Sequence, residues 1–388
     1  MDINWNAKMI SKSLIAIKII LLFYSFLIIE QTFAYPEMVR HGYLSCNGCH
    51  SSTGGGDYLS DYGRSIHEEL ISAQQVFVNF QKNENRDSDI DNESKLAGIF
   101  IGELRFQYGF KARLLQSFLE NSQISKARFM IMQLQGDALL SYSDKIDLFY
   151  SLGRQEPKIP DATFKDYIYT PQAWIQYKNQ ITEEFGFSIR SGKYIPNYGV
   201  NFAEHVFLVR SALGFGPGQE SNNLELSGQY LNEEINLSFV NQKEKKYFIS
   251  KYSHSFIDNN LKIGINTKTT SDQKDYSVLG VFLIKGFENH KYLIFEIDKR
   301  QNFDHKNGLI ETLKYGQEIS RGLQYFLIQE YANFNIEITD PHQESLGIGL
   351  HYFPSTLFNF ESIIKKEKKS EVSNEFQNIL WIIGTMSI

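Results

Sequence analysis

The stretch IDLFYSLG, Ile146–Gly153, has a large apolar side chain at every second position: Ile146, Leu148, Tyr150 and Leu152. Period-two alternation indicates a β-strand, because successive side chains of a strand point to opposite faces of the sheet. The same pattern recurs along most of the later chain, and helical spacing never exceeds it over a comparable length. It predicts an all-β body. The alternating rows begin with Ile146/Leu148/Tyr150/Leu152 and continue with Leu104/Phe106/Tyr108/Phe110, Phe185/Phe187/Ile189, Ile235/Leu237/Phe239, Leu261/Ile263/Ile265, Leu309/Leu313/Tyr315, Leu323/Tyr325/Leu327 and Leu346/Ile348/Leu350/Tyr352.

The spacing of these strands favours one large barrel over residues 96–388. Soluble sandwich domains of about 100 residues would need boundary linkers within this region, and the sequence shows none. Short joins at 231–234 and 258–260 contrast with longer ones at 154–170, 193–222 and 299–306, as in outer-membrane barrels. At roughly 18 residues per strand and connection, the region holds about 16 strands. The expected fold is mostly β, a transmembrane antiparallel barrel preceded by a small α-helical module.

The composition agrees with a β-type membrane protein. The chain has 388 residues, with 39 Lys and Arg against 45 Asp and Glu, so its formal net charge is −6. This charge argues against a nucleic-acid partner, which requires a basic surface. The 30 Phe and 22 Tyr are many for a chain whose mean hydropathy is below zero. Strands with one lipid face and one polar lumen face account for both observations.

The first 34 residues have the features of an export signal. Lysines at positions 8, 12 and 18 precede the apolar run Ile19–Ile29, and Thr32-Phe33-Ala34 has small residues at the positions that a cleavage site requires. An uncleaved anchor is the alternative, but the apolar run is shorter than the roughly 20 residues of a membrane-spanning helix. We therefore expect a mature chain that begins at Tyr35. A module at 35–78 and a polar linker at 79–95 would then precede the barrel.

Cys46-Asn47-Gly48-Cys49-His50 is a C-x-x-C-H motif, the attachment signature of a c-type haem. The two thiols form thioethers to the haem vinyl groups, and the adjacent imidazole binds the iron from the proximal side. A redox C-x-x-C usually lies in a βαβ context that is missing here, and a zinc site would need further ligands. Both cysteines of the chain fall in this motif, so we expect one covalent haem c held by Cys46 and Cys49, with His50 as iron ligand.

Other haem contacts are open at the level of sequence. The candidates for the distal iron ligand are His41, Met38 and His67, and His41 is preferred because its short tether could fold back over the ring. Arg64 has two interpretations: a contact to a haem propionate, or a cap on the first turn of a helix expected at Ser65–Ser72. Glycines at 54–56 would let the backbone approach a flat ligand.

An exported C-x-x-C-H module joined to a β-barrel resembles the fused outer-membrane cytochrome–porins, which include iron-oxidising cytochromes. The segment from Met38 to Tyr43, the haem motif, the glycines and Tyr62-Gly63-Arg64 resemble a pattern in uncharacterised barrel proteins of Gram-negative bacteria. The block from Gly192 to Gly199, with His205, Arg210 and Gly214-Phe215-Gly216, is similar to the same group. The resemblance implies that Cys46 and Cys49 carry the haem, that His50 ligates it, and that the barrel holds the module in or at the pore.

The leading functional hypothesis is one-electron transfer at or across the bacterial outer membrane. Its expected partners are a periplasmic redox carrier such as another cytochrome, an extracellular electron donor or acceptor, and outer-membrane lipid. We expect an electron carrier without catalytic residues rather than a classical enzyme; an enzymatic version would be an oxidoreductase such as an Fe(II) oxidase.

Two alternatives stay open. The first is a porin-like transport barrel in which the haem region is a plug, gate or redox sensor. The lumen of such a barrel would contain Arg105, Lys111, Arg190 and Arg210. These cations would either favour the passage of anions or be ordinary polar lining. The second is a soluble periplasmic β protein that bears a haem.

Overall fold

The computed structural model describes residues 36–46, 48–50, 59–73, 99–154, 168–182, 184–202, 207–216, 218–242, 245–270, 275–302, 307–336, 342–369 and 373–387. Short helices occupy its N-terminal part and two of its joins: η1 (Pro36–His41), α2 (Asp61–Ile66), η2 (His67–Ile71), α4 (Leu208–Ala212) and η4 (Ile257–Asn259). None of the helices in these ranges is long and apolar enough to cross a membrane. The predicted signal at 1–34, the linker at 79–95, the glycines at 54–56 and His205 lie outside the described residues.

All strands belong to one antiparallel sheet. They are β1 (Ile99–Ile101), β2 (Leu104–Glu120), β3 (Ser125–Tyr142), β4 (Ile146–Arg154), β5 (Ile168–Tyr169), β6 (Ala173–Gln180), β7 (Phe185–Tyr194), β8 (Ser221–Tyr230), β9 (Glu233–Gln242), β10 (Lys245–Phe256), β11 (Leu261–Thr270), β12 (Tyr276–Phe287), β13 (Lys291–Asn302), β14 (Asn307–Ser320), β15 (Leu323–Asn333), β16 (His342–Ser355), β17 (Phe358–Lys369) and β18 (Ser373–Ser387).

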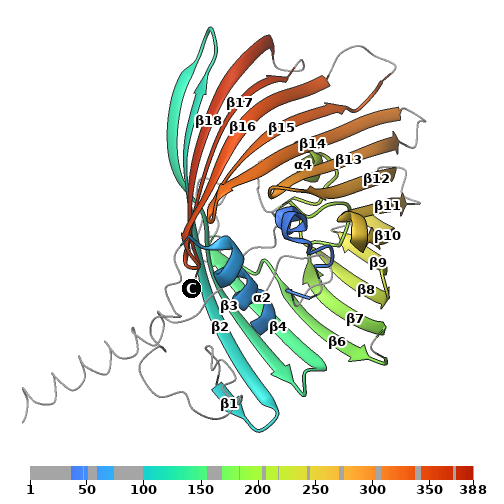
Figure 1. The fold of residues 1–388 in the computed structure, drawn as a ribbon. Coiled ribbons are helices and arrows are strands. Elements are labelled where there is room, and N and C mark those ends of the chain that lie inside the picture. Colours follow the sequence, from blue (N-terminus) through green and yellow to red (C-terminus); the bar gives the residue numbers. More distant parts are fainter. Residues whose placement is uncertain are drawn as a thin grey trace, which may run out of the picture.

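The sheet closes on itself as a barrel (Figure 1). Each long strand pairs with the next along the chain, and β18 returns to β2, with Ile383 opposite Leu115. Of the 18 strands in the described ranges, β1 and β5 are short additions, which leaves a 16-strand barrel. The prediction of an antiparallel barrel of about 16 strands is confirmed.

The alternation in the sequence separates the two faces of the wall. In β4, Ile146, Leu148, Tyr150 and Leu152 are exposed on the outside, whereas Asp147 and Ser151 are buried on the inside. The same division holds in β16, where Leu346, Ile348, Leu350 and Tyr352 are exposed. Exposed apolar side chains along the outer wall are what a lipid-facing band requires.

The two ends of the barrel differ in their connections. At one end, tight turns join the strands, and two of them place consecutive residues at positive φ: Ser143 with Asp144, and Asn289 with His290. Such residues match the right-handed twist of a hairpin. The other end carries the long joins, including the one between β7 and β8 that contains α4. We refer to these as the short-turn end and the long-loop end.

Two sequence-predicted boundaries were wrong. The join expected at 299–306 begins later, because β13 continues to Asn302 with Lys299 paired opposite Leu309. The run Lys299-Arg300-Gln301 is polar on both faces, so alternation did not reveal it. The helix expected at Ser65–Ser72 begins earlier, at Asp61, because the Ser60 side chain accepts a hydrogen bond from the Gly63 amide and caps it.

The lumen is filled on one side. Helix η1 lies inside the barrel against β12 and β13, and α4 packs against β14 and β15 (Figure 1). An apolar core forms between these inserts and the inner wall of the strands from β9 to β17. It includes Val39 from η1, Val209 from α4, and Ile249, Tyr292 and Phe326 from the wall. The larger open cavities in the described structure lie beside the strands from β2 to β8 and between α4 and β2, β3 and β16–β18.

Candidate functional site

The C-x-x-C-H motif forms a tight turn at the inner side of the barrel wall. The amides of Cys49 and His50 both donate to the Cys46 carbonyl oxygen, at 3.3 and 3.0 Å, and His50 forms an isolated bridge with Leu59. This turn brings both thiols and the imidazole together in one short segment. Burial raises the pKa of the Cys46 thiol and, with the neighbouring Cys46, that of Cys49.

A cavity with about 830 Å³ of empty space, its opening included, lies next to the motif. Both cysteines and His50 line it, so the sequence motif and the cavity coincide. The remaining walls come from the N-terminal helices, from the β7–β8 join and from the barrel, and they are mostly apolar: Met38, Leu44, Leu59, Ile66, His67, Ile71, Val200, Lys251, Lys262, Phe282 and Ile284 among others.

Two of the three candidate distal ligands line this cavity. His67, the first residue of η2, is 4% exposed, and its ring meets Phe353 edge-on at 6.1 Å. Burial lowers the pKa of His67 to about 3, so its imidazole is neutral, the form that binds iron. Its Nδ1 lies 3.5 Å from the Ser72 hydroxyl, which places Nε2 at the other edge of the ring. Met38 lines the cavity from η1 and packs against Ile71 and Phe353.

His41, the preferred ligand at the level of sequence, is not among the residues that line the cavity. Its Nε2 lies 2.9 Å from Glu318 Oε2, and its ring contacts that of His290 at 4.8 Å. The tether does fold inward, but η1 directs this side chain to the barrel turns instead of the motif. Of the three candidates, His67 and Met38 line the cavity and His41 does not.

Arg64 lies in α2 and is buried, at 4% exposure. Its Nη1 donates to the Leu59 carbonyl oxygen at 2.9 Å, which ties α2 to the end of the motif loop. Reorientation of the Gln107 amide would let its oxygen accept from Arg64 Nη2 at 3.1 Å. Arg64 lines a neighbouring cavity rather than that of the motif, so its contact to a propionate stays a prediction.

Sequence reasoning missed two lysines on the barrel wall of the cavity. Lys251 donates to Asn197 Oδ1 at 3.1 Å and to the Gly199 carbonyl at 2.7 Å, which holds the β7–β8 join. Lys262 pairs with Glu234 at 2.7 Å and donates to the Leu44 carbonyl at 3.1 Å. Both lysines occupy inward-facing positions of strands with alternating side chains, and this alternation was the only sign in the sequence that they face the lumen. Nothing in the sequence linked them to the motif, which lies some 200 residues earlier.

A wider cavity, of about 1,780 Å³ with its opening, adjoins the motif at the short-turn end. It is bounded by the short-turn ends of the strands from β2 to β8, and His50 and Leu59 line both cavities. Another cavity, of about 1,090 Å³, lies in the long-loop half between α4 and the strands β2, β3 and β16–β18. The motif therefore has an aqueous approach from the short-turn end.

The four cations proposed for anion passage do not form a continuous row. Arg190 pairs with Glu225 at 3.2 Å in the wall. Arg210 of α4 donates to the Tyr198 carbonyl and, at 3.2 Å, to Asn201 Oδ1. Burial lowers the pKa of Arg210, opposed by the charges of Glu296 and Asp298. Of the other two, Arg105 lines the wide cavity, on β2, and Lys111 lies further along the same strand.

Solved structures with this fold include outer-membrane proteins and a porin. A loop-deletion variant of OmpT, an outer membrane protein of Vibrio cholerae, is 10% identical. The match covers 74% of this chain and the whole OmpT chain, with a TM-score of 0.57. OmpF of Salmonella typhi, solved with daunomycin, is 11% identical. The match covers 75% of this chain and the whole OmpF chain, with a TM-score of 0.56. An anion-selective porin from Comamonas acidovorans is 9% identical. The match covers 74% of this chain and the whole porin chain, with a TM-score of 0.54.

At these identities the likeness establishes the fold alone. The chain is a porin-like outer-membrane type of β-barrel. No family model matches the chain, and no curated protein matches it either.

Proposed function

We propose that the chain is an outer-membrane electron-transfer protein in which Cys46 and Cys49 hold one covalent haem c inside the barrel. The observation that carries this proposal is the shared cavity, since both thiols, His50, His67 and Met38 line a single space. The membrane location is supported by the porin-like fold and by the exposed apolar outer wall. As expected of an outer-membrane barrel, the short-turn end would face the periplasm.

The residues around the cavity fit a haem. The donor set contains two thiols for thioether formation, one imidazole for the proximal position and either an imidazole or a thioether sulfur for the distal position. When bound, haem c supplies one-electron chemistry at iron. Apolar side chains such as Leu44, Ile66 and Phe282 would exclude water from the macrocycle and, with axial ligation, set its potential.

The position of His50 suggests how electrons enter or leave. Because His50 lines both the motif cavity and the wide cavity at the short-turn end, a carrier in the periplasm could approach this edge of the site. A soluble cytochrome or another small redox protein is the partner we propose there. An extracellular donor or acceptor would exchange electrons from the long-loop end, where the inserts leave the smaller third cavity.

The second candidate function is transport through the barrel, with the N-terminal segment as plug or sensor. The comparisons favour this candidate over electron transfer, because two matched barrels are named as a porin and a channel. Packing in the lumen argues for a narrow path at most: η1 and the β7–β8 join form a continuous apolar core with the strands from β9 to β17. Passage would be restricted to the cavities beside β2–β8 and β16–β18.

One experiment separates the two functions. The full chain is extracted from outer membranes in detergent, and its pyridine haemochrome spectrum and redox titration are compared with those of Cys49→Ala. Electron transfer predicts a covalent c-type spectrum that changes in the variant and redox exchange across proteoliposomes that the variant loses. A large conductance in planar bilayers that Cys49→Ala leaves unchanged, together with no covalent haem, would establish the transport function and overturn the first.

A further inference from the structure

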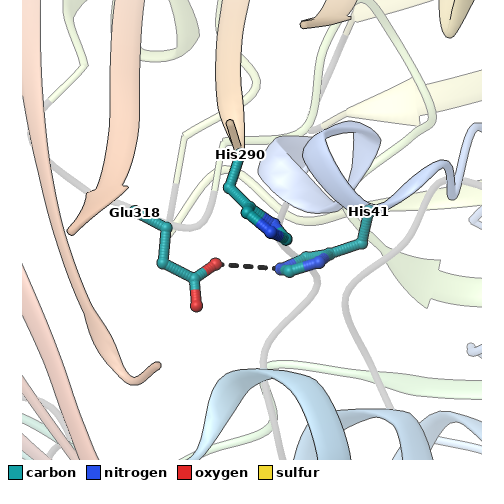
Figure 2. A group of neighbouring side chains, drawn as sticks. All are labelled: His41, His290 and Glu318. Carbon is teal, nitrogen blue, oxygen red and sulfur yellow. Dashed lines mark hydrogen bonds and ion pairs between the residues drawn. The ribbon is translucent and has the colours of Figure 1, made fainter. Parts of the chain in front are cut away.

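Three metal-ligating side chains meet at the short-turn end, outside the haem cavity. His41 comes from η1, His290 from the β12–β13 turn and Glu318 from the end of β14. Their ligand atoms all lie within 4.8 Å of one another, and His41 Nε2 is 2.9 Å from Glu318 Oε2. Figure 2 shows the two imidazole rings and the carboxylate turned toward a common point.

We propose that His41, His290 and Glu318 form a site for a divalent transition-metal ion. Imidazole and carboxylate together suit ions such as Zn²⁺, whereas Ca²⁺ and Mg²⁺ prefer oxygen ligands alone. Three protein ligands leave at least one coordination position for water. The inference stands on this geometry and does not depend on the proposed haem function.

The distances allow a metal after a small movement. Bonds of about 2.0–2.2 Å place the ligand atoms roughly 3–3.5 Å apart, so a separation of 4.8 Å must shrink by roughly 1.3–1.8 Å. His290 can supply this movement because it is exposed in the three-residue turn 288–290, whereas the side chain of His41 in η1 is only 8% exposed. The Glu318 carboxylate is already held in place.

Arg40 holds that carboxylate and tunes the site. Its Nε donates to Glu318 Oε2 at 2.8 Å, and its Nη1 donates to the Glu37 carbonyl at 3.1 Å. A ligating carboxylate is commonly oriented by such a hydrogen bond. The guanidinium charge also repels a dication, which selects for ions that gain most from imidazole ligation and disfavours those held by charge alone.

A metal at this point would fasten the N-terminal segment to the barrel. His41 lies five residues before Cys46, and the other two ligands belong to neighbouring hairpins. The ion would therefore link the segment that carries the C-x-x-C-H motif to β12–β15. It would also use His41 in a role other than haem ligation.

The test uses the full chain as isolated in detergent, stripped with a chelator and titrated with Zn²⁺ by calorimetry. We expect one Zn²⁺ per chain and at least tenfold weaker binding in His290→Asn, since asparagine tolerates positive φ and preserves the turn. His290→Asp, which restores a ligand, should recover part of the affinity. The matched control is His254→Asn, because His254 faces a single carboxylate, Glu233, at 3.6 Å in the same half of the barrel.

X-ray absorption at the zinc edge supplies a readout that the haem iron does not affect, and outer-shell scattering from two imidazoles is the expected result. The proposal is overturned if Zn²⁺ does not saturate a single site, or if His290→Asn and His254→Asn bind it equally. It is also overturned if His41→Asn changes the haem spectrum while Zn²⁺ binding stays as in the unmodified chain.

Discussion

Gly63 of α2 packs directly on the backbone of Cys49. A Cβ atom at position 63 would lie 2.3 Å from the Cys49 carbonyl oxygen and 2.9 Å from its Cα, closer than packed atoms approach. The helix that begins at Asp61 therefore rests on the C-x-x-C-H turn itself. Its Ser60 cap is joined to the same turn, since the Ser60 amide donates to the Cys49 carbonyl at 2.9 Å.

This contact predicts that Gly63→Ala damages the proposed haem site. The added methyl must displace either α2 or the motif turn, because the atoms it meets belong to backbone. We expect a clear fall in covalent haem per chain, measured by pyridine haemochrome against total protein. Gly48→Ala is the control, since a Cβ there meets nothing within 4 Å even though the position lies inside the motif. Equal haem content in both variants would contradict the role of the contact.

The distal position leads to a second prediction. His67→Ala should convert a low-spin haem spectrum to a high-spin one, because His67 lines the cavity as a neutral imidazole with Ser72 at its Nδ1. Visible and electron paramagnetic resonance spectra measure the change.

Met38→Leu and His41→Ala serve as the comparison variants. Met38 already packs against Ile71 and Phe353, and His41 is engaged with Glu318, so both should keep the low-spin spectrum. A spin change in Met38→Leu alone would assign the sulfur as distal ligand instead.

The sequence was sufficient for the barrel and insufficient for what fills it. Alternation such as that of Ile146–Gly153 fixes which face of a strand meets lipid, so strand number and orientation follow from local pattern. The motif was also visible, because both cysteines and His50 are adjacent in the chain.

The walls of the site could not be predicted in the same way. Lys251, Lys262 and Phe282 reach the cavity only because barrel closure brings β10–β12 against a segment some 200 residues earlier. The sequence also could not show that His67 lines the cavity and His41 does not. His41 lies 5 residues before Cys46, and His67 lies 17 residues after His50. The side chain of His41 is nevertheless directed toward the turns, because Glu37, Arg40 and Val39 of η1 contact the barrel.

Docking of η1 inside the barrel depends on a buried ion pair. Lys314 Nζ of β14 contacts Glu37 Oε1, and both side chains are fully buried. Removing one partner leaves an uncompensated buried charge, at a cost of about 3–5 kcal/mol. We expect Lys314→Met to release the N-terminal segment, seen as faster hydrogen exchange and proteolysis near 36–46 while the barrel stays folded.

The double variant tests whether charge is the cause. Lys314→Met with Glu37→Met places apolar groups on both sides, a change that is often neutral in buried pairs. Protection of the segment should largely return. If the double variant is as exposed as the single one, the contribution of Lys314 arises from its packing beside Phe326, 4.4 Å from the ring centre, and not from the pair.

The Lys262–Glu234 pair on the cavity wall gives the last prediction, in the haem potential. Ferric haem carries one more positive charge than ferrous haem, so an unpaired anion nearby favours the ferric state and an unpaired cation the ferrous state. Lys262→Met leaves Glu234 without its partner at 2.7 Å and should lower the midpoint potential, on the order of tens of millivolts. Glu234→Gln leaves Lys262 unpaired and should raise the midpoint potential, and the potential of the double variant should lie near that of the unmodified chain.

Redox titration of the detergent-solubilised protein measures all three potentials. The control is Arg190→Met, because Arg190 pairs with Glu225 in the wall outside the haem cavity. Shifts of the same sign in Lys262→Met and Glu234→Gln would mean that the pair acts through structure rather than charge.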